Sequence, residues 1–406
     1  MPIDIVRGQC TCAAMELSRR ITAITPATAD GWAVFRRARA LAAAGEPVQD
    51  LTLGEHDIGT DPGILAAMAE AAAGGRTGYA EVPGSPALRA EIAARATART
   101  GVPTGPEHVM VTAGAQFALF AAALAVGDPG ARLVFPDPYY PCYPGTARAA
   151  GLVPVPLVTR AEDGFLPRRA ALEAATDGAA ALLINTPNNP TGAVYGRPVL
   201  AEIAEVARAR DLWLISDEVY ETQVWQGRHL SPRALPGLAE RVLAVGSMSK
   251  GHAMTGARIG WLIGPPHVVA ALADLAEHTT YGVPGFVQDA ALFALRQGPA
   301  FEAAVAAPFR RRQARIAAQL AGASGLRAHP MEGAMYAMLD IRPTGLSGLA
   351  FAEALLEAER IAVMPGESFG RAAAGHVRVA LTLPDEQLAD AVGRLARFAE
   401  AAAAPR

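Results

Sequence analysis

Between residues 109 and 263 the sequence alternates short apolar segments with longer amphipathic ones. The apolar segments lack the polar–apolar alternation of a half-exposed strand, so they predict strands that are buried on both faces, as in a parallel sheet. They are Val109–Thr112, Arg132–Phe135, Ala180–Asn185, Leu212–Ser216, Val242–Val245 and Ile259–Ile263. Helical segments between them predict an α/β fold, a mostly parallel central sheet with helices on both faces.

The two ends of the chain have a different character. After Pro299, the long helical segment Phe301–Leu320 precedes short strands interleaved with helices, which predicts a smaller α+β domain. The N-terminal arm has no sheet of its own, so we expect it to pack with this unit. We therefore predict a large domain over residues 51–299, which opens with a strand at Leu51–Leu53, and a small domain formed by residues 1–50 and 300–406. We expect Arg310, Arg311 and Arg312 to form a solvated helix face.

Charge and composition exclude several classes of protein. The 36 basic and 39 acidic residues leave a net charge of −3, without the basic excess of a nucleic-acid binder. The apolar run Phe117–Val126 is shorter than the roughly 20 residues of a membrane span. The N-terminus lacks a signal-peptide pattern, and Cys10, Cys12 and Cys142 form neither a disulfide framework nor a zinc motif. We expect a cytoplasmic protein without nucleic-acid, membrane or metal partners.

Three predicted strands run into polar motifs at their C-terminal ends, where open α/β sheets bind ligands. The motifs are Asn-Thr-Pro-Asn-Asn-Pro-Thr-Gly at 185–192, Asp-Glu-Val-Tyr at 217–220, and Gly-Ser-Met-Ser-Lys at 246–250, followed by Thr-Gly-Ala-Arg-Ile-Gly-Trp at 255–261. Because parallel strands end at one edge of a sheet, these motifs are expected to meet there.

Lys250 is the central residue of this set. Partial burial and a neighbouring cation lower the pKa of a lysine, and a neutral lysine can form a Schiff base. Arg258 offers a planar fork that suits a phosphate, and Ser247 adds a hydroxyl. Asp217, half-buried at an adjacent strand end, needs a cationic partner such as a pyridinium nitrogen.

The remaining polar groups complete the pattern. Asn189 and Tyr220 can donate hydrogen bonds to a phenolic oxygen. Gly114, Ala115 and Gln116 open a helix directly after a strand, so their backbone N–H groups can hold a phosphate. Together these groups are the parts of a pyridoxal-phosphate site.

The same motifs closely resemble those of the class I and II aminotransferases, which are fold-type-I pyridoxal-phosphate enzymes. The spacing is 28 residues from Asn189 to Asp217, 33 more to Lys250 and eight more to Arg258. The resemblance covers nearly the whole chain, from Leu-Gly-Glu at 53–55 to His-Val-Arg at 376–378. It implies an aminotransferase that moves an amino group between an L-amino acid and a 2-oxo acid by a ping-pong mechanism.

The resemblance also implies roles for individual residues. Lys250 corresponds to the Schiff-base lysine that moves the proton, Asp217 to the partner of the ring nitrogen, and Asn189 and Tyr220 to the partners of the phenolic oxygen. Tyr140 corresponds to the aromatic residue stacked on the ring. The phosphate group is surrounded by Gly114, Ala115, Gln116, Ser247 and Arg258.

Three further positions concern the substrate and a second subunit. Arg378 corresponds to the arginine that binds the substrate α-carboxylate, with Gly54 and Asn189 close to it. Tyr79 corresponds to a tyrosine that reaches the phosphate of the neighbouring subunit, which implies a homodimer with active sites at the interface.

Several alternatives remain at the level of sequence. Tyr139 can replace Tyr140, Asn188 can replace Asn189, and His252 is a second candidate base. The same motifs serve β-eliminating C–S lyases and decarboxylases. A cofactor-binding regulatory protein is disfavoured because no basic DNA-binding domain precedes the large domain. The aromatic segment at 281–286 favours a substrate with a neutral or aromatic side chain.

Overall fold

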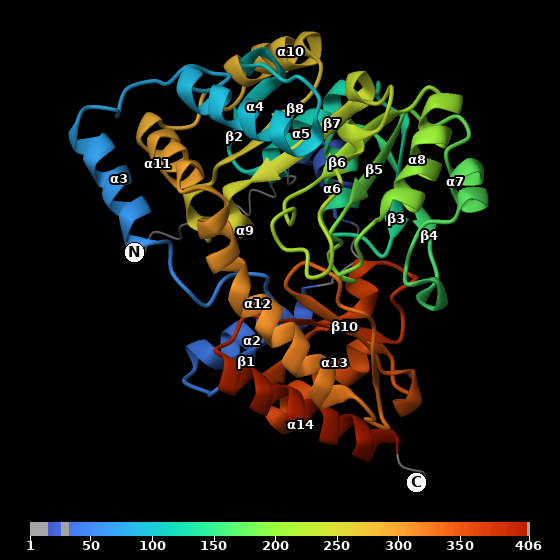
Figure 1. Ribbon diagram of the computed structural model, residues 1–406. Coiled ribbons are helices and arrows are strands. Elements are labelled where there is room, and N and C mark those ends of the chain that lie inside the picture. Colours follow the sequence, from blue (N-terminus) through green and yellow to red (C-terminus); the bar gives the residue numbers. More distant parts are fainter. Residues whose placement is uncertain (1–14, 26–31, 404–406) are drawn as a thin grey trace, which may run out of the picture.

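A seven-stranded sheet forms the centre of the larger part of the molecule (Figure 1). In this computed structural model, which describes residues 15–25 and 32–403, the strand order is β2-β8-β7-β6-β5-β3-β4. Strand β8 is antiparallel to β2 and β7, and the other neighbouring pairs are parallel. The strands are β2 (Val109–Thr112), β3 (Arg132–Asp137), β4 (Val153–Val158), β5 (Ala181–Asn185), β6 (Trp213–Asp217), β7 (Val242–Ser247) and β8 (Gly260–Ile263). The predicted α/β class with a mostly parallel sheet is confirmed.

Helices cover both faces of this sheet. The apolar strands explain why, because alternate residues of β5 enter opposite cores: Leu182 and Ile184 enter one, Ala181 and Leu183 the other. The first core is closed by α3 (Pro62–Ala73), α4 (Pro86–Thr100), α7 (Arg169–Ala175), α8 (Arg197–Ala209) and α11 (Gly285–Arg296), and the second by α5 (Ala115–Ala125), α6 (Tyr143–Ala149) and α10 (Pro266–Glu277). Each leucine-sized side chain buried here contributes about 1.5–3 kcal/mol of transfer free energy.

Local signals in the sequence set the helix ends. Asp61 accepts a hydrogen bond of 2.8 Å from the backbone N–H of Gly63 and so caps α3. Pro86 occupies the first turn of α4, where its missing N–H costs no helix bond, and Gly101 ends the helix with a φ of +73°.

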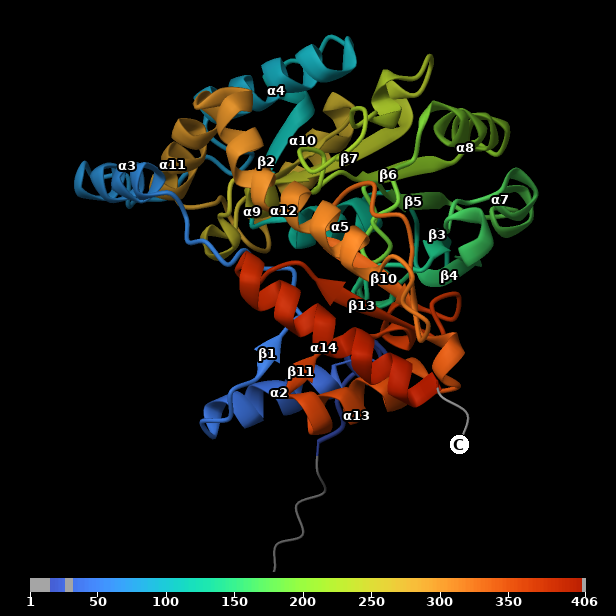
Figure 2. The same cartoon turned by 60° about the horizontal axis from the view of Figure 1, so that its bottom comes forward.

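A separate core lies in the smaller part of the molecule, which the C-terminal part of the chain forms with the N-terminal segment (Figure 2). Its antiparallel sheet has the order β12-β13-β10-β9 and packs with four helices. These elements are β9 (Arg327–Ala328), β10 (Tyr336–Asp340), β12 (Met364–Pro365), β13 (His376–Ala380), α2 (Ala33–Ala43), α12 (Gly298–Leu320), α13 (Gly348–Glu359) and α14 (Asp385–Ala403). The N-terminal segment joins this part through β1 (Gln49–Asp50), which pairs in parallel with β11 (Ile361–Ala362). We propose that the domain boundaries lie at 50/51 and 299/300. The cores divide near these positions, with Leu51 packed in the smaller core and Phe301 against the larger one.

Two expectations about local structure are wrong. Residues Leu51–Leu53 do not form a strand: the carbonyls of Thr52 and Leu53 accept hydrogen bonds from the side chains of Arg378 and Thr382, whereas Leu51 makes backbone bonds to Ala362 and Ala380. Arg312 is not solvated. It is 4% exposed and donates to both carboxylate oxygens of Asp57, at 2.8 and 2.7 Å. The buried charge is retained because carboxylates pair with it.

No helix among the described residues has both the length and the apolar character that a membrane span requires.

Candidate active site

A cavity of about 290 Å³ lies at the C-terminal ends of β5, β6 and β7. Each of the three motifs contributes to its wall, and Arg378 on β13 reaches it from the smaller sheet. Of the predicted site residues, the lining includes Gly54, Ala115, Gln116, Tyr140, Asn189, Asp217, Tyr220, Ser247, Lys250, Arg258 and Arg378. The chain therefore brings together groups that lie more than 300 residues apart in sequence.

Lys250 lies on α9 (Met248–Gly251), directly after β7, and its Nζ donates to the Gly54 carbonyl. Burial, together with the charges of Arg378 and Arg258, lowers the pKa of Lys250 to about 8 against the opposing effect of Glu55. A substantial fraction of the amine is thus neutral near physiological pH, as a nucleophile or proton acceptor requires.

Asp217 ends β6 and is 4% exposed. Burial raises the pKa of its carboxyl to about 6, although the Tyr143 hydroxyl donates to Oδ2 at 2.6 Å. The sequence reasoning missed Tyr143. Its only signal was its place in the aromatic cluster that contains Tyr139 and Tyr140. Among the described residues, the hydrogen-bond partners of this carboxylate include no cationic side chain, so a positively charged ligand atom would compensate it.

Tyr220 and Asn189 meet at a second residue that the sequence reasoning missed, Tyr336. The Tyr220 and Tyr336 hydroxyls are 2.7 Å apart, and Asn189 Nδ2 donates to Tyr336 at 3.5 Å. Asn188 does not line the cavity, because its Oδ1 accepts from Thr191 instead. Tyr336 also explains Gly54, since a Cβ there would lie 1.8 Å from the Tyr336 hydroxyl oxygen.

Arg378 is 3% exposed and lies between the rings of Tyr336 and Phe369, with its Cζ 4.4 and 4.5 Å from their centroids. Its Nη1 donates to Asn189 Oδ1 at 2.9 Å, and Nη2 donates to the Thr52 carbonyl. Its Nε is buried and has no partner. A buried N–H without an acceptor is costly, so this guanidinium is suited to an anion.

Arg258 lines the cavity, and Gly114 lies directly beside Arg258 without lining the cavity itself. Gly114 has a φ of +79° at the start of α5, and a Cβ there would lie 2.4 Å from Arg258 Nη2. Arg258 Nη1 is oriented by the Thr255 carbonyl at 2.8 Å. Arg258 and Ser247 line the cavity together with Ala115 and Gln116 from the start of α5, a set of residue types that suits a phosphate.

Other expectations concern residues around this cavity. Tyr140 lines it, whereas Tyr139 does not. His252 does not line it either, and burial with the charges of Arg95 and Arg99 lowers its pKa to about 3. Tyr79 lies outside the cavity, is 95% exposed and stacks on Tyr281 at 5.5 Å.

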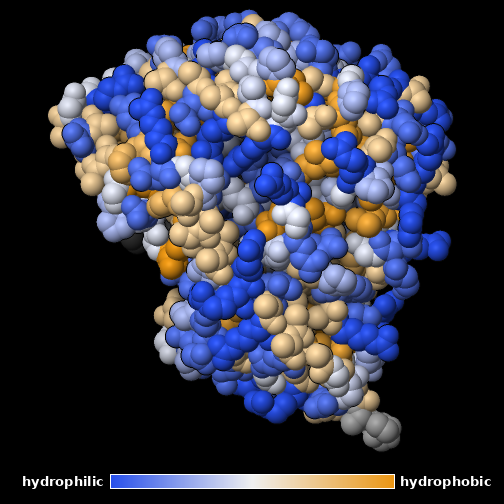
Figure 3. Space-filling model, in the orientation of Figure 1, coloured by the Kyte–Doolittle hydropathy of each residue, from blue (hydrophilic) through white to orange (hydrophobic). Residues whose placement is uncertain are grey.

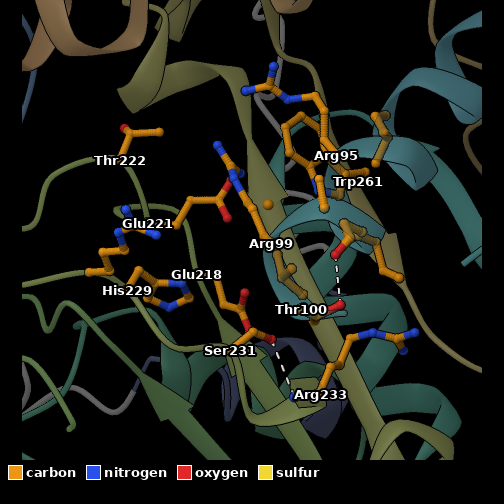
Figure 4. A pocket seen from close by; sticks show the side chains of 18 of the residues that line it. Arg95, Arg99, Thr100, Glu218, Glu221, Thr222, His229, Ser231, Arg233 and Trp261 are labelled. Atoms are coloured by element: carbon orange, nitrogen blue, oxygen red, sulfur yellow. Dashed lines mark hydrogen bonds and ion pairs between the residues drawn. The ribbon is translucent and has the colours of Figure 1, made fainter. Parts of the chain in front are cut away.

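A second cavity of about 400 Å³ contains none of the predicted site residues. In Figure 4, charged side chains converge on it, among them Glu221, which pairs with Arg99, and Glu218, which accepts a hydrogen bond from Ser231 at 2.7 Å. Arg99 pairs with Glu221 within this cavity, and Arg95 pairs with Glu302 outside its lining. The first cavity holds the residues that the sequence predicted and remains the better candidate for chemistry.

The donor set of the first cavity fits pyridoxal phosphate. Three cations, Lys250, Arg258 and Arg378, suit a ligand with a phosphate, a carbonyl group and a bound carboxylate. The uncompensated carboxylate of Asp217 suits a protonated ring nitrogen.

Comparisons with known proteins agree with this geometry. The family model described as aminotransferase class I and II matches residues 46–395. Arginine–pyruvate transaminase of Pseudomonas aeruginosa is 41% identical over 91% of this chain and 94% of its own. Aspartate/prephenate aminotransferase of Thermus thermophilus is 38% identical over 94% of this chain and 98% of its own. The solved structure of aspartate aminotransferase from Thermus thermophilus with maleate has a TM-score of 0.89 and 37% identity, covering 95% of this chain and 100% of that one. The chain belongs to the class I and II aminotransferase family and is an aminotransferase.

Proposed function

We propose that this protein is a pyridoxal-phosphate-dependent aminotransferase that exchanges an amino group between an L-amino acid and a 2-oxo acid by a ping-pong mechanism. The observation that carries the proposal is a single cavity that holds a lysine with a pKa near 8, a buried carboxylate and two arginines. Bound pyridoxal phosphate supplies an electron sink for the bonds at the substrate α-carbon.

The protein's own groups supply positioning and proton transfer. In its neutral form, Lys250 would take the proton from the α-carbon of the amino donor. In the second half-reaction it would return a proton to the α-carbon of the new amino acid. The Asp217 carboxylate, which the Tyr143 hydroxyl orients, would stabilise a positive charge at the ring nitrogen. Tyr220 and Asn189 would hold the phenolic oxygen through the hydroxyl–amide chain that includes Tyr336.

Arg378 would bind the α-carboxylate of either substrate through two parallel N–H groups. Its fixed place between two rings limits the orientation of the substrate and so the bond at the α-carbon that faces the ring.

The cavity lining also bears on the substrate side chain. In the part of the chain that the structure describes, its lysines and arginines are Lys250, Arg258 and Arg378, and each already has a proposed partner. The carboxylate of Glu55 lines the same cavity. We therefore expect amino donors without a second carboxylate to be preferred, and the arginine–pyruvate relative makes arginine and pyruvate the first pair to test.

A cytoplasmic homodimer is part of the same proposal. Tyr79 and Tyr281 are 95% and 58% exposed and stack on each other, which is an unusual state for aromatic side chains facing water. Leu65 on α3 and Phe293 on α11 are exposed as well. Figure 3 shows apolar residues over the region of these two helices, at the upper left. A second copy of the chain would cover them, as the family's dimer implies.

The test is a screen of the purified, cofactor-loaded protein. Each amino acid is added in the absence of an oxo acid, and both the absorption of the bound cofactor and the 2-oxo acid product are followed. The expected result is one equivalent of oxo acid per site, with catalytic turnover after a second oxo acid is supplied. Release of ammonia with pyruvate would instead support a β-eliminating lyase, and release of carbon dioxide a decarboxylase.

A matched pair of variants checks the assignment of the lysine. Lys250→Ala removes the amine. The described lining of the cavity offers no second lysine as a control, so the neighbouring substitution Ser249→Ala serves instead. Loss of covalently attached cofactor in Lys250→Ala alone supports the proposal. Normal turnover by Lys250→Ala would refute it.

A further inference from the structure

Two histidines and an aspartate meet on the smaller sheet, outside the active-site cavity. Asp340 on β10 pairs in register with His376 on β13. His329 follows β9, and its backbone N–H donates to the Met338 carbonyl at 3.0 Å, which places it beside the same two strands. One possible ligand atom from each of the three residues lies within 4.8 Å of the others.

The two imidazoles face each other through Nε2. These atoms are 3.1 Å apart, and the rings are inclined by 32° at a centroid separation of 5.1 Å. Two imidazole nitrogens bound to one metal ion at about 2.0–2.1 Å have this separation when the angle between the bonds is about 95–100°. That angle lies between the octahedral and tetrahedral values, so the spacing suits two neighbouring ligands of one ion.

Other contacts orient these ligands. His376 Nδ1 lies 3.0 Å from the Ala374 carbonyl, so it carries the proton and leaves a lone pair on Nε2. Histidine ligands of metals almost always make such a bond through their other nitrogen. The Asp340 carboxylate is held by Arg342, whose Nε and Nη2 donate at 2.9 and 2.7 Å. Asp340 Oδ2 accepts from Nη2 and keeps a further acceptor position.

The surroundings suit neutral imidazoles. His376 is 1% exposed and Asp340 is 6% exposed. The ring of Phe165 contacts both histidines edge-on, at 4.9 and 5.7 Å between centroids. His329 also lines a surface pocket that gives an ion access from solvent.

We propose that His329, Asp340 and His376 bind one divalent transition-metal ion, of the kind that two imidazoles and a carboxylate favour, such as Zn²⁺. The three residues are separated by 11 and 36 positions in sequence. They therefore do not form a short metal-binding motif that the sequence would show. Since the ion joins β9, β10 and β13, its binding stabilises the sheet that carries Arg378 rather than taking part in amino transfer.

The experiment uses the cofactor-loaded protein after treatment with a chelator. Zn²⁺ binding is measured by titration calorimetry, and Co²⁺ is added separately as a spectroscopic probe whose visible absorption reports imidazole ligation. The expected result is one ion per chain, competition between Zn²⁺ and Co²⁺, and a higher melting temperature with Zn²⁺. The variants are His329→Gln and Asp340→Asn, with His278→Gln, an exposed histidine outside the cluster, as the matched control.

Loss of more than about tenfold in Zn²⁺ affinity in His329→Gln, with unchanged affinity in His278→Gln, supports the site. The folded state of each variant is checked by its unchanged circular dichroism and its bound cofactor. Stoichiometric binding that survives in both cluster variants, or the absence of saturable binding in the wild type, would overturn the proposal.

Discussion

The hydrogen bond from Tyr143 to Asp217 makes a quantitative test of the site possible. At 2.6 Å it has the length of a hydrogen bond between a hydroxyl and an ionised carboxylate. Such bonds contribute about 1.5–3 kcal/mol, so Tyr143→Phe should raise the pKa of Asp217 in the cofactor-free protein by about one to two units. The wild-type value is already about 6, because the carboxyl is buried.

The sign of the effect on stability follows from proton linkage. The folded state holds the Asp217 proton more tightly than the unfolded chain, whose value is near 3.8. This carboxyl therefore lowers the stability of the cofactor-free protein as pH rises from about 4 to 6. In Tyr143→Phe the loss continues to a pH of about 7 to 8, so the stability gap to wild type widens by about 1.5–2.5 kcal/mol between pH 4 and pH 8.

Urea unfolding of both proteins at several pH values measures that gap. Tyr195→Phe is the control, because Tyr195 is another buried tyrosine of the large sheet's core. We expect the widening in Tyr143→Phe alone, and a smaller one with cofactor bound, since a positively charged ring nitrogen compensates the carboxylate. A gap that is constant with pH, or one that the control reproduces, would refute this account of Asp217.

Three more outcomes follow from the same contacts. Arg378→Lys keeps the charge but loses the fork, so initial-rate kinetics should show KM for both substrates rising about tenfold or more, with a smaller change in kcat; an unchanged KM would contradict the carboxylate assignment. Gly114→Ala places a Cβ against Arg258 at a backbone φ of +79°, so equilibrium dialysis should show weaker cofactor binding. The control Gly130→Ala also has a positive φ, of +92°, but open space around it, and should bind the cofactor normally. Arg312→Met leaves two carboxylates without their buried partner and should lower the unfolding free energy by about 3 kcal/mol, while Arg311→Met at an exposed pair should change it little. Equal effects of the two arginine variants in urea unfolding would refute that distinction.

The alternation of apolar strands and amphipathic helices was sufficient to predict the α/β sheet, because burial on both faces leaves a local pattern in each strand. The same holds for Lys250, Asp217 and Asn189. They follow strands whose C-terminal ends must meet at one edge, so their proximity is a consequence of topology that the sequence shows.

Other features depend on contacts between segments that are distant in sequence, and no local pattern reports them. Leu51–Leu53 has the apolar character of a strand, yet the carbonyls of Thr52 and Leu53 accept hydrogen bonds from the side chains of Arg378 and Thr382. Arg312 resembles its exposed neighbours, but the fold brings Asp57 and Asp385 to it and buries it. Nothing in the sequence around Tyr143 or Tyr336 reports their hydrogen-bond partners, because the packing of α6 and β10 against the strand ends brings their hydroxyls to Asp217 and Tyr220. The helices and strands thus follow from the hydrophobic periodicity of the chain. The hydrogen bonds and pKa shifts of the site depend on which distant polar groups the fold buries next to each other.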